Sequence, residues 1–205
     1  KIINTSKTVY GIGWGADSST LFIMNADEIE IWDVESETVQ GNKEIELTSP
    51  MELACNKEGT KFAIYNTYGK IEIIDDITEE SFELVDYENM RRDSMKHMEW
   101  SPSGDYLAVC RVDEEKRDTS YFYIPGMLDI YDVNNKELVL SIPMRNYPAR
   151  SIWSPDGEEI IAVQNTGEAV LVDVSTGRLV RKIPVNSDIS GSDLRPYISW
   201  SPDGS

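Results

Sequence analysis

Short apolar segments separated by turn residues run along the whole chain. Stretches such as 159–163 (EIIAV) and 106–110 (YLAVC) are continuous apolar runs, which are typical of strands that are buried on both faces. Residues 168–174 (EAVLVDV) are rich in β-branched side chains and follow a turn, as expected of a further strand. The pattern therefore predicts many short antiparallel strands and almost no helix.

One phrase punctuates this pattern. Trp-Ser-Pro-Asp-Gly stands at 153–157 and 200–204, and Trp-Ser-Pro-Ser-Gly at 100–104. Within the four residues Ser-Pro-Asp-Gly, proline stands at the second position and glycine at the fourth, which predicts a type I turn. Alignment on the tryptophan gives five equivalent positions, which are Trp14, Cys55, Trp100, Trp153 and Trp200. A second landmark follows in each complete unit, at Asp33, Asp75, Asp132 and Asp173. Such recurrence marks a unit of architecture and not a catalytic motif.

Each unit reads as four strands, and four antiparallel strands every 40 to 50 residues is the sequence form of a propeller blade. Residues 31–39 (IWDVESETV), 130–139 (IYDVNNKELV) and 171–180 (LVDVSTGRLV) resemble the end of the repeat in WD-repeat β-propellers. The WSPDG phrase is also similar to the repeat of TolB-like propellers. The resemblance implies an all-β fold, a partial β-propeller forming one domain over 1–205. Its four complete blades and the start of a fifth are expected at about 9–45, 50–86, 96–143, 149–185 and 196–205.

The repeats depart from the WD pattern in two ways. The Gly-His dipeptide is absent because His97 is the single histidine, and the second unit replaces the turn by Cys-Asn-Lys-Glu-Gly at 55–59. A fifth unit that breaks off after its first strand would leave unpaired strand edges. We therefore expect missing blades to come from the rest of a longer chain or from another chain.

The tryptophans at the repeat position are expected to pack between blades, with Trp14, Trp100 and Trp153 largely buried. Catalytic signals are missing from the sequence. There is no Gly-x-Ser-x-Gly elbow, no spaced Cys or His metal motif and no glycine-rich phosphate loop beyond a weak match at 11–15 (GIGWG). The chain is therefore predicted to be no enzyme by itself and to need no cofactor or metal.

The chain carries a net charge of −18, which disfavours sequence-independent binding to nucleic acid. No apolar run approaches the roughly 20 residues that span a membrane, so we expect a soluble protein. The compartment is not determined by the sequence, and a cytoplasmic location is slightly favoured over secretion. The two cysteines, Cys55 and Cys110, lie in apolar stretches and are expected to be free thiols.

Function is expected where the repeats differ, because insertions map to loops on one face. The longest connections cover 86–97, 111–126, 143–150 and 185–197 and are expected to share that face. Seven of the nine arginines, Arg111 among them, and six aromatic residues fall in these connections. Arginine and tyrosine often anchor interfaces. The candidate partner-binding residues are Arg91, Arg92, Arg117, Tyr121, Phe122, Tyr123, Arg145, Tyr147, Arg150, Arg195 and Tyr197.

Several interpretations of this face remain open. The first is a non-catalytic scaffold that binds a protein or peptide with acidic groups. The second is an accessory propeller that gates access to a larger hydrolase, and the third is a propeller that binds a small ligand between stacked aromatic rings. In a further alternative the arginines only pair with acids on a solvated rim, which would be Asp86, Asp93, Asp113 or Glu115.

Overall fold

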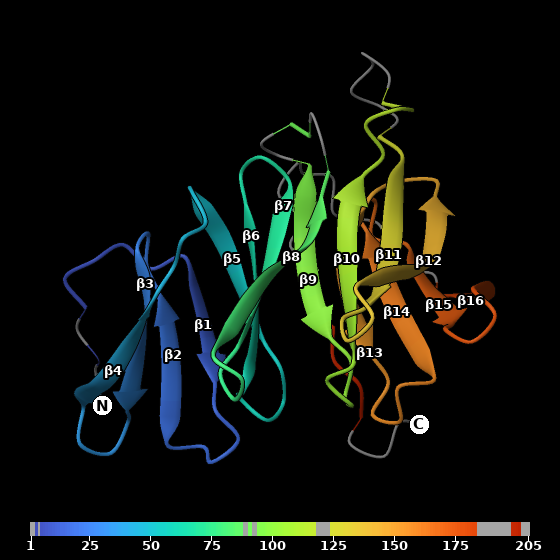
Figure 1. Cartoon of the computed structure of the whole chain (residues 1–205). Coiled ribbons are helices and arrows are strands. Elements are labelled where there is room, and N and C mark those ends of the chain that lie inside the picture. Colours follow the sequence, from blue (N-terminus) through green and yellow to red (C-terminus); the bar gives the residue numbers. More distant parts are fainter. Residues whose placement is uncertain are drawn as a thin grey trace. The chain divides into compact units, whose positions relative to one another are not determined.

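The computed structural model describes residues 3, 5–87, 90–91, 94–117, 124–183 and 198–201. These residues form sixteen strands and no helix, and the strands make four antiparallel sheets (Figure 1). Within each sheet four consecutive strands lie side by side in sequence order. The prediction of consecutive four-stranded antiparallel blades is therefore confirmed. The chain divides into two compact units, residues 1–90 and 91–205, and each is described by itself.

Unit 1 contains two sheets. The first comprises β1 (Gly11–Trp14), β2 (Thr20–Met24), β3 (Glu28–Asp33) and β4 (Thr38–Glu44), and the second β5 (Pro50–Cys55), β6 (Lys61–Asn66), β7 (Lys70–Asp75) and β8 (Glu80–Asp86). Apolar side chains of both sheets form one buried cluster. At its centre the rings of Phe22 and Phe62 meet edge to face, with centroids 4.7 Å apart.

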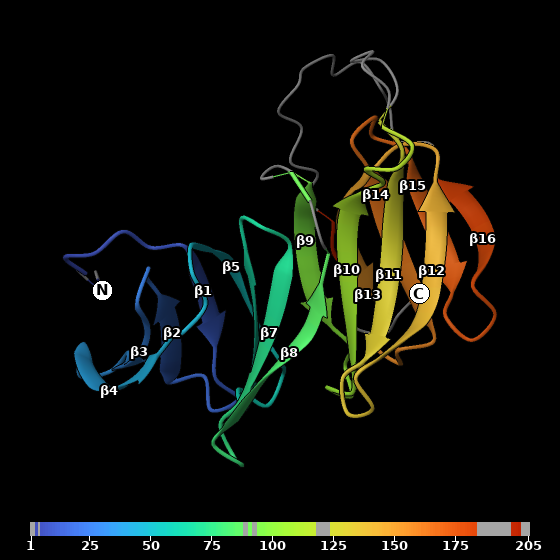
Figure 2. The ribbon, with the colours of Figure 1, turned by 45° about the horizontal axis from the view of Figure 1, so that its top comes forward.

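Unit 2 repeats this arrangement (Figure 2). The third sheet comprises β9 (Met95–Trp100), β10 (Tyr106–Val112), β11 (Gly126–Asp132) and β12 (Glu137–Met144), and the fourth β13 (Pro148–Trp153), β14 (Glu159–Gln164), β15 (Ala169–Asp173) and β16 (Arg178–Ile183). A buried cluster that includes Ala108, Ile130, Trp153 and Val172 joins the facing sides of these sheets. The core is thus a layer between two sheets, as the continuous apolar runs require.

The described turns at 101–104 (Ser-Pro-Ser-Gly) and 154–157 (Ser-Pro-Asp-Gly) have the predicted form. The Gly157 amide donates to the Ser154 carbonyl oxygen at 2.9 Å, which closes the turn, and Gly157 has a φ of +76°. The Ser154 hydroxyl oxygen also accepts the Glu159 amide at 2.9 Å. In the second repeat of the chain, which lies in unit 1, Asn56 replaces the serine. Its side-chain oxygen accepts the Thr60 and Lys61 amides. Chemically different residues therefore close the same turn.

The recurring aspartates close the turn between the third and fourth strands of each sheet. A carboxylate oxygen of Asp33 accepts the Ser36 amide at 2.7 Å, and Asp173 accepts the Thr176 amide at 2.8 Å. Hydrogen bonds from the side chain of Ser175 and the backbone of Thr176 lower the pKa of Asp173. The landmark aspartates therefore have a structural role in the turn.

The tryptophans of the repeat position differ in burial. Trp100 and Trp153 are 6% and 5% exposed, as predicted, whereas Trp14 is 54% exposed. The prediction was wrong for Trp14 for a geometric reason. The glycines of β1 face β5, and side chains alternate along a strand, so Trp14 points away from the second sheet. Trp153 has the equivalent orientation but is covered by side chains of the third sheet.

The two glycines of β1 allow an unusually close approach to β5. A Cβ atom at Gly13 would lie 2.7 Å from the Cβ of Cys55, and one at Gly11 would lie 2.6 Å from the Cβ of Leu53. Cys55 takes the place of the repeat tryptophan and is compatible with this short spacing. Burial raises the pKa of its thiol to about 12, so Cys55 acts as an apolar packing residue.

We expect the Gly13→Ala substitution to destabilise unit 1 by about 1–3 kcal/mol, because the added methyl group overpacks the contact with β5. Gly41→Ala on β4 is the matched control, since the nearest atom to its added Cβ lies 3.9 Å away. Urea denaturation of both variants measures the difference. Equal stabilities for the two variants would contradict the close-packing role of Gly13.

Candidate functional site

The described parts of the long connections of unit 2 meet at one end of its sheets, and the connection predicted at 185–197 lies outside the described residues. The Val112 amide donates to the Ser94 carbonyl oxygen at 2.8 Å, which ties the entry of β9 to the end of β10. Gly126 pairs with Met144, so β11 begins beside the end of β12. Pro148 pairs with Gln164, so β13 begins beside the end of β14. The described parts of the connections therefore share one end, called here the loop end of unit 2 (Figure 2).

A short, tightly held loop lies at the centre of this end. The Tyr147 amide donates to the Ile124 carbonyl oxygen at 2.8 Å, and its own carbonyl oxygen accepts the Asn165 amide at 3.1 Å. The ammonium group of Lys96 lies 4.7 Å from the centroid of the Tyr147 ring, a cation–π contact. Backbone and ring are thereby positioned together, so Tyr147 is a pre-ordered residue of the site.

Arg145 lies two residues before Tyr147 on the same loop. Its side chain is exposed and forms no ion pair with any residue that the structure describes. The following amide, of Asn146, donates to the Oε1 atom of Gln164 at 2.9 Å and holds the loop from the other side. A cation that forms no ion pair with the described residues therefore stands on a backbone that hydrogen bonds anchor.

Two other candidate arginines share one carboxylate as their ion-pair partner. Arg117 lies 3.1 Å from a carboxylate oxygen of Glu114, and Arg91 lies 3.5 Å from the other. The Ser94 hydroxyl donates to the same carboxylate. Glu114 was not among the acids considered from the sequence, and Asp113 pairs with Lys116 instead. Arg91 and Arg117 thus pair with an acid, as the solvated-rim interpretation expects, but the acid is Glu114 and the Arg117 side chain is only 18% exposed.

The other arginines and aromatic residues that the sequence placed in the connections fall into two groups. Arg111 belongs to β10 and Arg150 to β13, so neither lies in a connection as the sequence suggested. Arg111 binds the buried Asp129, with Nε and Oδ2 2.6 Å apart. Six candidates lie outside the described residues: Arg92, Tyr121, Phe122, Tyr123, Arg195 and Tyr197.

Sequence reasoning missed Glu99, which lies on β9 below the loop end. Its backbone carbonyl oxygen accepts the Trp153 indole N–H at 3.3 Å. Its Oε2 atom is enclosed and has no hydrogen-bond partner among the described residues. Burial raises the pKa of Glu99 to about 7, although His97, Arg150 and a hydrogen bond from the Trp153 backbone oppose the rise. Glu99 is therefore a carboxyl group that titrates near neutrality.

A signal for Glu99 was present in the repeats. The aligned positions hold Gly13, Ala54, Ile152 and Ser199, none of which carries a charge. Ser151 likewise differs from its aligned residues, among them Ile12, Leu53 and Met98, which are apolar. Ser151 is 1% exposed, and its hydroxyl oxygen has no partner among the described atoms. The layer between the third and fourth sheets is thus more polar near its inner strands than the repeat predicts.

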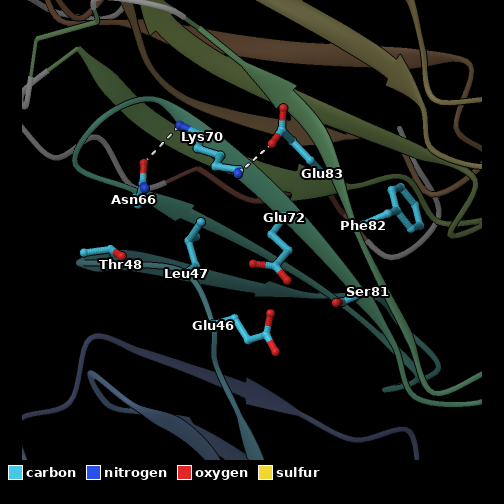
Figure 3. Close-up of a pocket in the computed structure, with 9 residues that line it drawn as sticks. All are labelled: Glu46, Leu47, Thr48, Asn66, Lys70, Glu72, Ser81, Phe82 and Glu83. Atoms are coloured by element: carbon cyan, nitrogen blue, oxygen red, sulfur yellow. Dashed lines mark hydrogen bonds and ion pairs between the residues drawn. The ribbon is translucent and has the colours of Figure 1, made fainter.

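Unit 1 contains a pocket of about 320 Å³. Figure 3 shows the carboxylates of Glu46, Glu72 and Glu83 around it, with Lys70 paired to Glu83 at 2.6 Å. Desolvation raises the pKa of Glu72, and its neighbours Glu46 and Glu83 act in the same direction. One aromatic residue, Phe82, is part of the lining. This carboxylate-rich lining differs from the stacked aromatic rings that the small-ligand interpretation requires.

Two kinds of feature are absent from the described part of the chain. Within it, no three His, Cys, Asp or Glu side chains gather closely enough to hold a metal ion. It also contains no helix with the length and apolarity needed to cross a bilayer.

Comparisons with known proteins concern the fold. No protein-family model matches the sequence, and no curated protein sequence matches it. Among solved structures, Kuenenia stuttgartiensis Hydrazine Synthase is similar, with a TM-score of 0.72 at 22% sequence identity. The match covers 100% of this chain and 57% of that chain, so this chain spans little more than half of its length. Together with the four antiparallel sheets, the likeness shows a partial propeller-like fold.

Proposed function

We propose that the loop end of unit 2 binds a protein or peptide partner that presents acidic groups. The chain acts in this proposal as a non-catalytic scaffold. The observation that carries the proposal is Arg145, an exposed guanidinium group without an ion-pair partner in the described structure. Within a chain of net charge −18, such a group is a local exception to the general repulsion of anions.

The anchored loop supports this proposal. Hydrogen bonds to Ile124, Gln164 and Asn165 fix the backbone around Tyr147 before any partner binds. A pre-ordered loop loses little conformational entropy on binding. The planar guanidinium group of Arg145 can form two parallel hydrogen bonds with one carboxylate. Tyr147, two residues further along the same loop, is partly exposed, and tyrosine and arginine are common interface anchors.

The Arg145→Glu substitution is expected to weaken partner binding about tenfold to a hundredfold, because a charge-assisted hydrogen bond contributes about 1.5–3 kcal/mol. A photo-crosslinking amino acid at position 146 first identifies the partner in cells of the natural source. The purified partner is then titrated against the wild-type chain and the variant by calorimetry. Affinity should also fall with rising salt, since exposed charges are screened.

Arg181→Glu provides the matched control, because Arg181 is an exposed arginine of the same unit on the outer strand β16. This variant has the same change of net charge and should bind as the wild type does. If the two variants bind the partner equally well, Arg145 is only a solvated surface residue and the proposal is wrong.

A further inference from the structure

One face of the first sheet carries a row of apolar side chains. Strand pairing places Trp14 opposite Leu21, Leu21 opposite Trp32 and Trp32 opposite Val39, so the row crosses all four strands. Trp14 is 54% and Val39 48% exposed. Ile12, two residues before Trp14 on the same side of β1, is 63% exposed. Trp32 itself is only 9% exposed, so the apolar side chains that this face presents to solvent are those of Ile12 and Trp14 on β1 and Val39 on β4.

The equivalent row in unit 2 is covered on its three inner strands, whereas its outer member Leu179 is 48% exposed, as Val39 is. It consists of Trp153, Ile160, Val172 and Leu179, paired across β13 to β16. Ile160 and Val172 are fully buried because the third sheet packs its own apolar side chains, among them Ala108 and Ile130, against them. In unit 2, the preceding sheet of the repeat therefore covers the face that carries the tryptophan row.

The same kind of hydrogen bond crosses both described interfaces of unit 2. The Trp153 indole N–H donates to the Glu99 carbonyl oxygen, and the Trp200 indole N–H donates to the Ile152 carbonyl oxygen, each at 3.3 Å. Glu99 and Ile152 each stand directly before the repeat tryptophan of their own unit. The covering sheet therefore supplies a main-chain carbonyl group from one fixed position of its inner strand.

We infer that a further four-stranded blade of this same repeat covers the face that carries Ile12 and Trp14. On the inner strand of this blade, the backbone carbonyl oxygen of the residue before the repeat position accepts a hydrogen bond from the Trp14 indole N–H. Its facing side chains are apolar, as Ile152, Ile161 and Leu171 are where they pack near Trp200. A second copy related by a two-fold axis would place the row against itself. A two-fold copy does not fit this arrangement, because the observed interfaces pair a tryptophan row with the opposite face of a neighbouring sheet.

Oxidative footprinting with mass spectrometry tests this inference. The probe is the hydroxyl radical, and the samples are the 205-residue chain and the protein isolated from its natural source. We expect Trp14 to be strongly oxidised in the 205-residue chain and to fall to the level of Trp153 in the native protein. Ile12→Asp, introduced into the native gene, should restore the oxidation of Trp14, because a carboxylate cannot be buried against an apolar sheet. Ile77→Asp, at a residue 75% exposed in the β7–β8 turn, should leave Trp14 protected.

Three outcomes would overturn the inference. In the first, Trp14 is oxidised equally in both samples. In the second, its protection survives Ile12→Asp although circular dichroism shows that the variant folds. In the third, the 205-residue chain alone protects Trp14 in step with a dimer seen by sedimentation, which would assign the face to a second copy.

Discussion

The Arg111→Ala substitution is expected to destabilise unit 2 by about 3–5 kcal/mol, the usual cost of breaking a buried ion pair. Asp129 has a fully buried side chain that accepts hydrogen bonds from Arg111 Nε at 2.6 Å and from the Ser141 hydroxyl at 2.5 Å. Removing the guanidinium group leaves a carboxylate in the core without the cation that offsets its desolvation. Urea denaturation, followed by the fluorescence of the buried tryptophans, measures the loss.

A double substitution separates this cause from a general loss of packing. Arg111→Leu with Asp129→Leu removes both charges, so it should recover most of the stability that Arg111→Ala loses. The control Arg181→Ala on β16 should change the free energy of unfolding by no more than about 0.5 kcal/mol. A double variant as unstable as the single one would show that the charge pair is not the cause.

The Glu99→Gln substitution is expected to stabilise unit 2 above neutral pH and to have little effect in acid. The pKa of Glu99 is about 7 in the folded chain, against an ordinary value of 4.5. Between these values the unfolded chain releases a proton that the folded chain retains. The wild type therefore loses up to about 3 kcal/mol of stability as the pH rises from 4.5 to 7. Glutamine carries no charge, so the variant escapes this loss.

The measurement is the free energy of unfolding of both chains from pH 4 to pH 8. The difference between them should be near zero at pH 4, grow through pH 5 to 7 and level off at pH 8. Glu137→Gln, at an exposed position of β12, should follow the wild type within about 0.5 kcal/mol. A constant difference between Glu99→Gln and wild type would assign the effect to packing and not to titration.

Most of the candidate site could be predicted only as a region. Loop lengths and the strand pattern placed Arg145 and Tyr147 at a shared end of the sheets, because antiparallel topology sends alternate connections to the same end. The individual contacts were beyond the sequence. Arg91 meets Glu114 only because folding brings two connections together, whereas Arg117 reaches the same carboxylate from three residues along the chain.

The sequence by itself determined the strands, the turns and the four blades, since these depend on alternation, turn chemistry and a repeated spacing, all of which are local. The tertiary structure alone decided which repeated residues are buried. Trp14 and Trp153 hold the same place in the repeat, yet they are 54% and 5% exposed. The burial of a side chain depends on whether another sheet packs against its face, and the sequence of a single strand does not specify which sheet packs there. The raised pKa of Glu99 has the same origin, because its cause is desolvation by packing from another sheet.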